Sequence, residues 1–235
     1  MYGIDQYTKL LLHCNGADTS QTFIDSATGK TVTAVGTAQV DTAQSVFGGA
    51  SLLLDGNSDY LSLADSEDWN FGSGDFTIDF WVRFATLPAE GNKIFILNQR
   101  YNASNFTEIS ILKTGGLYYW AHDAYSGGVQ ITGYDRLTTV STNTWYHVAF
   151  VRNGTECYWF QGGAKCGTTI ASGEITMPNI AALLEIGRWS GGGYYLNGGT
   201  DEFRVSKGIA RWTANFTPPT SAYSRAGGSF LLRLI

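Results

Sequence analysis

Residues Gly74–Phe84 read GDFTIDFWVRF, and the run Leu52–Leu63, LLLDGNSDYLSL, leads into them. Apolar side chains occupy every second position of the first stretch, at Phe76, Ile78, Phe80, Val82 and Phe84. A period of two is that of a strand with one buried face. A strand this apolar requires a large apolar partner surface, which a second sheet about 10 Å away supplies. We therefore predict an all-β, two-sheet antiparallel sandwich.

The rest of the chain predicts roughly a dozen short strands, a number and spacing typical of a sandwich. A second alternating strand is Trp145–Arg152, WYHVAFVR. Gly115-Gly116 predicts a hairpin, and Asp65–Asn70 a short helical turn or a loop. The other predicted strands are Tyr7–Cys14, Thr31–Val40, Lys93–Asn98, Thr107–Lys113, Leu117–His122, Val129–Ile131, Asp135–Val140, Cys157–Phe160, Ala164–Thr168, Leu184–Gly187 and Asp201–Ser206.

The composition fits one β-rich domain and argues against two classes of partner. The 235 residues are 43% hydrophobic with 29 glycines, and the net charge is -5. Nucleic-acid binders cluster Lys and Arg on one face, and no such cluster is visible here. No apolar run approaches the ~20 residues that span a bilayer, and no signal peptide is visible. We expect an extracellular or virion-surface protein that is processed or exported by another route.

The domain is predicted to cover residues 1–223, because no linker-like change of composition precedes Pro218. The tail 224–235, SRAGGSFLLRLI, then offers a short apolar run with no turn to return it. Exposed, such a run would be a pairing hazard. It either adds to an edge of its own sheet or is covered by a partner chain, and we favour a partner, such as another virion or surface protein or a second copy in a homo-oligomer.

Two cysteines flank a predicted hairpin. If Gln161-Gly162 are its central turn residues, Cys157 faces Cys166 at a non-hydrogen-bonded pair, close enough for a disulfide. If Gly162-Gly163 make the turn, the register slips and the bond is disfavoured. The sequence leaves both registers open; we favour the first, with Cys14 left as a buried free thiol.

Four blocks of the sequence resemble one family. They are VFGGASLLLDGNSDYLSL, DFTIDFWVRF, NTWYHVAFVRNG and GTDEFRVSKGIARWTANFTPPT, and they cover most of residues 7–223. Their order resembles the laminin G-like, concanavalin A-like jelly-roll superfamily, in the pentraxin-type branch common in bacterial surface proteins and bacteriophage structural proteins. The resemblance implies two curved sheets, with rim loops and a concave face used for glycans or proteins. Function is not decided by the fold.

The superfamily also contains glycoside hydrolases, which need two carboxylates beside the scissile bond. Related glucanases carry three acidic residues alternating along one strand. The matching strand here offers only Asp75 and Asp79, with Thr77 between them. We expect Asp79 to pair with an Arg or a hydroxyl of a neighbouring strand on an exposed face, and we expect no catalysis.

The same resemblance implies a structural calcium between an early loop and the acidic residue of the last strand. Carried over, its ligands would be Asn15, Asp18 and Asp201. Calcium takes six to eight oxygen ligands, often from irregular loops. Relatives often have Asp where Asn15 stands, so the site here carries less charge. The alternative is that Asp18 and Asp201 cap turns.

Aromatic residues near glycine-rich loops predict a glycan platform. Sugar rings present apolar C–H faces that stack on Trp and Tyr, while polar groups bind the hydroxyls. The alternative is that these rings fill the space between the sheets. The predicted ligand-binding residues are Trp120, His122, Tyr125, Arg188, Trp189, Tyr194 and Tyr195.

The first interpretation is a non-catalytic module that binds carbohydrate at a cell or virion surface. The rival is a structural virion protein, in a tail or as a capsid decoration, that acts through protein–protein assembly. Loss of glycan binding in Trp189→Ala or Tyr194→Ala would favour the first. A symmetric oligomer or a capsid-bound state held by the tail would favour the second.

Overall fold

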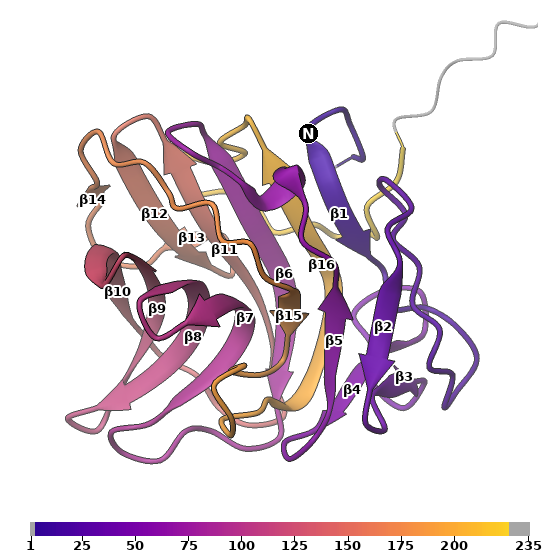
Figure 1. Cartoon of the computed structure of the whole chain (residues 1–235). Helices are drawn as coiled ribbons and strands as arrows, with labels where there is room; N and C mark the ends of the chain where they lie inside the picture. The colour runs from indigo at the N-terminus through magenta and orange to yellow at the C-terminus, as the bar shows by residue number, and fades with distance from the viewer. Residues whose placement is uncertain (1–2, 226–235) are drawn as a thin grey trace, which may run out of the picture.

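Two antiparallel sheets pack face to face in the structure, a computed structural model that describes residues 3–225 (Figure 1). The seven-stranded sheet lies in front in Figure 1 and the nine-stranded sheet behind it. The predicted two-sheet all-β sandwich is thereby confirmed. The predicted helical turn is the 3-10 helix η1 (Glu67–Trp69). The tail prediction lies outside the described residues from 226 onward; at 224 the Ile4 amide donates to the Ser224 carbonyl, 2.8 Å away.

The nine-stranded sheet runs in the order β13-β12-β11-β6-β16-β4-β3, with β1 paired to β16 and β14 paired to β12. The long strand β6 lies at its centre, and β16 pairs with it on both sides of a register shift between Asp201 and Arg204. The strands are β1 (Thr8–Leu12), β3 (Gln39–Asp41), β4 (Ser51–Asp55), β6 (Phe76–Phe84), β11 (Trp145–Asn153), β12 (Glu156–Gln161), β13 (Ala164–Lys165), β14 (Ile170–Ala171) and β16 (Asn197–Lys207).

The seven-stranded sheet runs in the order β10-β9-β8-β7-β15-β5-β2. Four consecutive long hairpin strands, β7 to β10, make one half of it. The strands are β2 (Val32–Val35), β5 (Tyr60–Leu63), β7 (Lys93–Asn102), β8 (Asn105–Thr114), β9 (Leu117–Ser126), β10 (Val129–Thr138) and β15 (Leu184–Ile186). The two strands predicted within 129–140 are a single strand, β10, with a register shift near its start.

Two predicted runs each divide between the sheets. Thr31–Val40 forms β2 in one sheet and β3 in the other, and Leu52–Leu63 forms β4 and β5 in the same way. At the second crossing, one oxygen of Asp55 accepts the amides of Asn57, Ser58 and Asp59. Gly56 adopts a φ of 76°, which glycine reaches without steric cost. A local turn therefore sends the chain from one layer to the other.

The core lies between the sheets and is rich in aromatic rings. Alternate residues of β6 point into it, as the sequence predicts, and Phe80 stacks on Phe203 of β16 with centroids 5.3 Å apart. Fully burying a side chain of this kind contributes about 1.5–3 kcal/mol to folding. This packing explains why β6 and β16 lie side by side at the centre of the sheet.

The other face of β6 is covered rather than exposed. Residues 209–223 cross it, and Asp79 on that face is fully buried. The expectation that Asp79 pairs with an Arg and a hydroxyl is confirmed, since Arg204 and Tyr223 both donate to it. The expectation of an exposed face is wrong, because the C-terminal segment packs as an additional layer on this sheet.

The predicted disulfide is wrong. Phe160 pairs with Lys165 and Gln161 with Ala164, so Gly162-Gly163 make the turn. In this register Cys157 pairs with Ile170 of β14 instead of Cys166. Both thiols are free, and Cys14 is free and buried as expected. The backbone turn therefore settles the alternative that the sequence left open.

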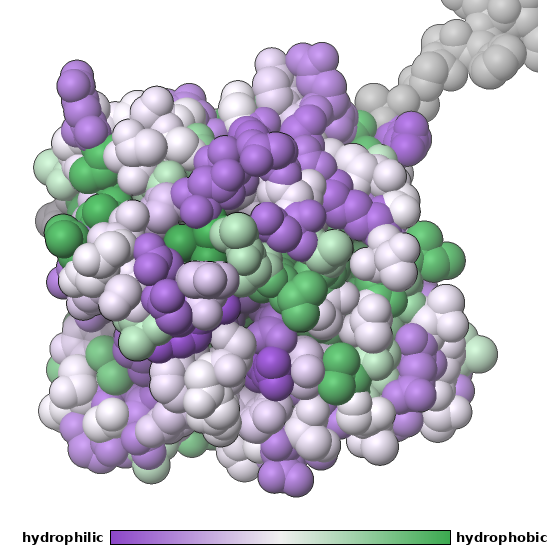
Figure 2. All heavy atoms as spheres, in the orientation of Figure 1, coloured by the Kyte–Doolittle hydropathy of each residue, from purple (hydrophilic) through white to green (hydrophobic). Residues whose placement is uncertain are grey.

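Figure 2 shows the molecule in the orientation of Figure 1, with the seven-stranded sheet toward the viewer. Hydrophobic residues on this face are scattered among polar ones rather than joined in one broad patch. A broad apolar patch would mark a protein or membrane contact.

Candidate functional site

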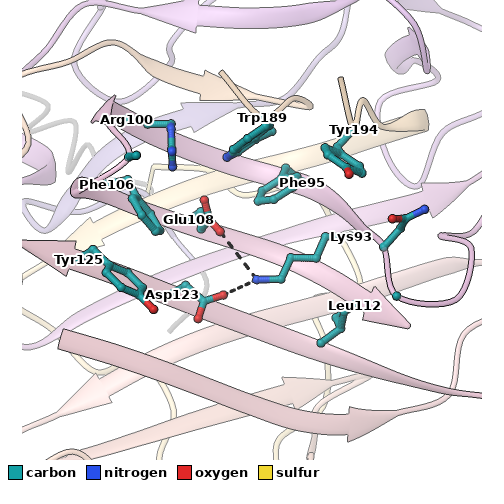
Figure 3. A pocket seen from close by; sticks show the side chains of 13 residues that line it. Lys93, Phe95, Arg100, Phe106, Glu108, Leu112, Asp123, Tyr125, Trp189 and Tyr194 are labelled. Atoms are coloured by element: carbon teal, nitrogen blue, oxygen red, sulfur yellow. Dashed lines mark hydrogen bonds and ion pairs between the residues drawn. The ribbon is translucent and has the colours of Figure 1, made fainter. Parts of the chain in front are cut away.

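A pocket of about 500 Å³ opens on the outer face of the seven-stranded sheet, over β7, β8 and β9 (Figure 3). Three of the predicted glycan-binding residues line it, namely Tyr125, Trp189 and Tyr194. Its full lining is Gly91, Asn92, Lys93, Phe95, Arg100, Ala103, Phe106, Glu108, Leu112, Asp123, Tyr125, Trp189 and Tyr194. The pocket therefore joins strand residues of the sheet to the loop between β15 and β16.

Strand alternation brings the floor residues together. Glu108 of β8 pairs across the ladder with Asn98 of β7 on one side and with Asp123 of β9 on the other. Side chains of directly paired residues lie on the same face of a sheet. Their chain neighbours, such as Ile109 and His122, point into the core instead. The pairing register, rather than the local sequence, therefore makes one polar floor from three strands.

Aromatic rings form two sides of the pocket. Phe95 stacks on Trp189 with centroids 6.0 Å apart, and Trp189 meets Tyr194 edge to face at 5.8 Å. On another side, Phe106 stacks on Tyr125 at 4.7 Å. Tyr194 has a φ of 59° and is 47% exposed. These rings hold one another in place while their free faces and edges border the hollow (Figure 3).

The floor is charged. The Nζ atom of Lys93 lies 2.5 Å from Oδ2 of Asp123 and 3.7 Å from Oε1 of Glu108 (Figure 3). Burial raises the pKa of Glu108 to about 7, a shift to which the Asp123 charge adds and which the Lys93 charge opposes. The Lys93 pKa is raised despite burial, because both carboxylates favour its ammonium form. Glu108 is thus the floor group that changes charge near neutral pH.

Arg100 lies between two of the rings. Its guanidinium carbon is 4.7 Å from the centroid of Phe106 and 4.9 Å from that of Trp189. Cation–π contacts of this kind contribute about 0.5–2 kcal/mol each. They hold the guanidinium plane at the edge of the pocket, above the floor (Figure 3).

A buried amide ties the loop to the floor. Oδ1 of Asn98 accepts from the Ser190 amide at 3.1 Å and from its hydroxyl at 2.6 Å. Nδ2 of Asn98 donates to Oε2 of Glu108 at 3.3 Å. Trp189 directly precedes Ser190, so its ring is placed by the same residue that contacts Glu108.

Two predicted ligand residues, Trp120 and His122, are corrected by their burial. Trp120 is fully buried between the sheets, where its Nε1 donates to Gln161. His122 is buried beside Thr107 and Thr132, and burial lowers its pKa to about 4. Both residues alternate inward on β9, so the core-packing alternative holds for them, and neither can reach a ligand at the surface.

Arg188 and Tyr195 lie outside the pocket lining. Arg188 forms an ion pair with Glu185 at 2.6 Å and covers the ring of Tyr60, with 3.8 Å between the guanidinium carbon and the ring centroid. Tyr195 is half-buried directly after Tyr194. The Arg188 guanidinium is therefore held by Glu185 and Tyr60 rather than turned toward the pocket.

The pocket residues that sequence reasoning missed include Lys93, Phe95, Arg100, Phe106 and Glu108. Alternation on the individual strands places most of them opposite core residues, and that signal was present in the sequence. The strand pairing that brings these residues together could not be read from the sequence, because β7 and β8 contain register shifts. A bulge changes which side chains face outward.

The predicted calcium ligands are only partly gathered. Asp201 is fully buried, and its Oδ2 accepts the amides of Val46 and Phe47 at 2.8 and 3.0 Å. The side-chain amide of Asn15 lies beside Gly48 of that loop, where an added Cβ would come within 2.3 Å of it. Asp18 lies on an exposed turn and accepts the amide of Thr42. Within residues 3–225, no group of three or more His, Cys, Asp or Glu side chains could hold a metal ion.

A family model described as the concanavalin A-like lectin/glucanases superfamily matches residues 55–211. The chain belongs to this superfamily. The laminin G-like resemblance in the sequence is thereby confirmed. No curated protein matches the sequence. Among residues 3–225, no helix is long and apolar enough to cross a membrane.

Solved structures similar to this superfamily member include toxin binding domains and a domain of an arabinanase. The binding domain of Paraclostridial Mosquitocidal Protein 1 has a TM-score of 0.63 at 18% identity, covering 86% of this chain and 49% of that chain. A second similar structure is Domain 4 of AbnA, a GH43 extracellular arabinanase from Geobacillus stearothermophilus, in complex with arabinotriose. Its TM-score is 0.60 at 18% identity, and the match covers 87% of this chain and 95% of that chain.

A third similar structure is the ligand binding domain of botulinum neurotoxin serotype D in complex with N-acetylneuraminic acid. Its TM-score is 0.62 at 14% identity, covering 88% of this chain and 49% of that chain. The chain thus spans about half the length of the two toxin domains. At these identities the likeness shows a shared jelly-roll fold.

Proposed function

We propose that this protein is a non-catalytic carbohydrate-binding module and that its ligand occupies the pocket over β7, β8 and β9. The observation that carries the proposal is the ring cluster of Phe95, Trp189 and Tyr194 beside a polar floor. Apolar sugar faces stack on such rings, and hydroxyls pair with groups like Lys93 and Asp123. A volume of about 500 Å³ lies within the range of small-ligand sites.

Two comparisons support the carbohydrate as ligand. The arabinanase domain was solved with arabinotriose, and a toxin domain with N-acetylneuraminic acid. Both share the jelly-roll fold with this chain. The arabinanase is extracellular, and we propose an extracellular place of action here as well, where glycans are displayed.

The position of Asp79 supports the non-catalytic part of the proposal. It is the one acidic residue of β6, the strand on which the glucanases carry their catalytic carboxylates. Asp79 is fully buried and bonded to Arg204, so no substrate reaches it. In the pocket, Asp123 and Glu108 share the charge of Lys93. A carboxylate neutralised by a lysine is a weaker nucleophile and base than a free one.

Trp189→Ala tests the proposal by glycan array and calorimetry. Binding to the best glycan should weaken at least about tenfold, which corresponds to about 1.4 kcal/mol. Trp145→Ala is the matched control, because Trp145 is also partly buried but lies on the other sheet. No glycan binding by the wild type, or equal losses in both variants, would refute the proposal. Release of reducing sugar from a bound glycan would refute its non-catalytic part.

We further propose a structural calcium held by Asp201 and Asn15 beside the loop 46–48. Oδ1 of Asp201 is buried and has no hydrogen-bond partner in the described part of the chain, which fits a cation ligand. Burial raises the pKa of Asp201 to about 6, and a bound cation would favour its ionised form. The contact of Asn15 with this loop fits as well. A bound calcium would neutralise the buried Asp201 carboxylate, at the point where the loop 46–48 meets β16.

A further inference from the structure

The guanidinium of Arg100 lies at the proposed glycan pocket, where the charge of Glu108 acts on it. It donates no hydrogen bond and forms no ion pair within residues 3–225, although Phe106 and Trp189 hold it on two sides. By contrast, the other cation of the pocket, Lys93, is bound to two carboxylates. A guanidinium carries five N–H donors in a fixed plane. All five of these donors remain for a ligand or for water.

Planar donors of this kind match one chemical group best. A carboxylate accepts two parallel N–H bonds from a guanidinium, and such bidentate pairs are among the strong hydrogen bonds in proteins. Stacking on Phe106 and Trp189 fixes the guanidinium plane in advance, so little side-chain freedom is lost on binding. Trp189 also borders the hollow next to Tyr194, which leaves an aromatic surface beside the charged donors.

We propose that the pocket selects acidic saccharides, whose carboxylate pairs with Arg100 while the sugar ring packs on Trp189 and Tyr194. The inference rests on the proposed function and names the ligand class of that site. A neutral sugar offers the guanidinium only uncharged hydroxyl oxygens, whereas a uronic-type or sialic-type sugar supplies a charged acceptor that can take two parallel N–H bonds.

The remaining charges near Arg100 make this selection depend on pH. Glu108 faces Arg100 and Lys93 from β8, Asp123 faces Lys93 from β9, and Asn98 is the polar neighbour on β7. An ionised Glu108 repels a ligand carboxylate and competes for the cations. Since burial raises the pKa of Glu108 to about 7, this repulsion grows as the pH rises through neutrality.

The test measures binding of oligogalacturonate and of sialyllactose, each beside its own methyl ester. The ester keeps the sugar and removes only the charge. The acids should bind the wild type at least about tenfold more tightly than the esters. Arg100→Gln should abolish this preference, so that the acid and its ester bind this variant equally well. Arg136→Gln is the matched control, since it removes the same charge from β10 outside the pocket lining.

Glu108→Gln tests the pH dependence, because it removes the ionisable carboxyl group from the pocket floor. Between about pH 6 and about pH 8, acid binding by the wild type should weaken, and the variant should bind tightly across this range. Equal binding of acid and ester, with both lost in Trp189→Ala, would overturn the selection for acids and leave the proposed function intact. Equal losses of acid binding in Arg100→Gln and Arg136→Gln would also overturn the selection by Arg100, because they would indicate a long-range effect of charge. Binding of no sugar at all would overturn both.

Discussion

At the scale of single residues, the burial of the ion pair between Asp79 and Arg204 under the C-terminal segment is the unexpected feature. Asp79 and Arg204 are both fully buried, with Nε of Arg204 2.9 Å from Oδ1 of Asp79. Tyr223 donates to the other oxygen of Asp79 at 2.5 Å, and His147 lies 3.6 Å from it. Burial alone would raise the pKa of Asp79, but the Arg204 charge and the His147 hydrogen bond lower it to about 2.

Asp79→Asn should destabilise the protein by about 3–5 kcal/mol, because it leaves the Arg204 charge buried without a counter-charge. Urea unfolding at neutral pH measures the loss. The wild-type pair contributes its stability above the ordinary Asp pKa, and the contribution disappears as the pH falls toward about 2. The difference between wild type and variant should therefore shrink in acid. A loss below about 1 kcal/mol would show that the pair contributes little.

At the scale of elements, the segment 209–223 acts as a third layer on the outer face of the nine-stranded sheet. Trp212 stacks on Phe216 with centroids 4.1 Å apart, and both pack against a small apolar cluster around Phe160. The Phe216 amide donates to the Gly163 carbonyl at 2.9 Å. The segment is thus anchored to the hairpin turn between β12 and β13.

Gly163→Ala should displace this segment, because a Cβ there would lie 1.9 Å from the Phe216 carbonyl oxygen. Gly162→Ala is the matched control. Its φ of 58° resembles the 77° of Gly163, but no atom lies within 4 Å of its added Cβ. Both variants carry the backbone strain of about 1 kcal/mol. Thermal unfolding should show at least about 1 kcal/mol of additional loss in Gly163→Ala. Equal losses would mean that the segment is not seated on the turn.

At the scale of the whole molecule, long-range pairing joins the start of the chain to its last strand. The β1 strand pairs with β16, and residues 46–47 donate to Asp201 of the same strand. His13 also contacts Glu202 at 2.6 Å. A cation at Asp201 would strengthen a junction that local structure cannot supply, because loops this far apart in sequence lose much entropy on closing.

Calcium should raise the melting temperature of the wild type, and magnesium should raise it less, because Mg²⁺ demands a tighter octahedral shell. A ligand at 100 times its Kd adds about 2.7 kcal/mol. Asn15→Ala should reduce the calcium effect, whereas Asn57→Ala, on another exposed turn, should keep it. Asn15 is exposed, so its variant should fold. No shift of the wild type with calcium would refute the cation site.

The sequence by itself determined the strands and the sandwich. The alternation of β6 and β11 is a local property that can be read from neighbouring residues. These patterns predicted two packed sheets and the family. They also predicted that Asp79 pairs with an Arg or a hydroxyl, although they placed that pair on an exposed face.

Only the tertiary structure decided which side chains meet. Trp120 and Trp189 are the same residue type near similar loops, yet one fills the core and the other borders the pocket. The pairing of Glu108 with Asp123 depends on bulges and register, and the loop that carries Trp189 arrives from a distant part of the chain. Registers and layers are set by long-range packing, which a period of two does not encode.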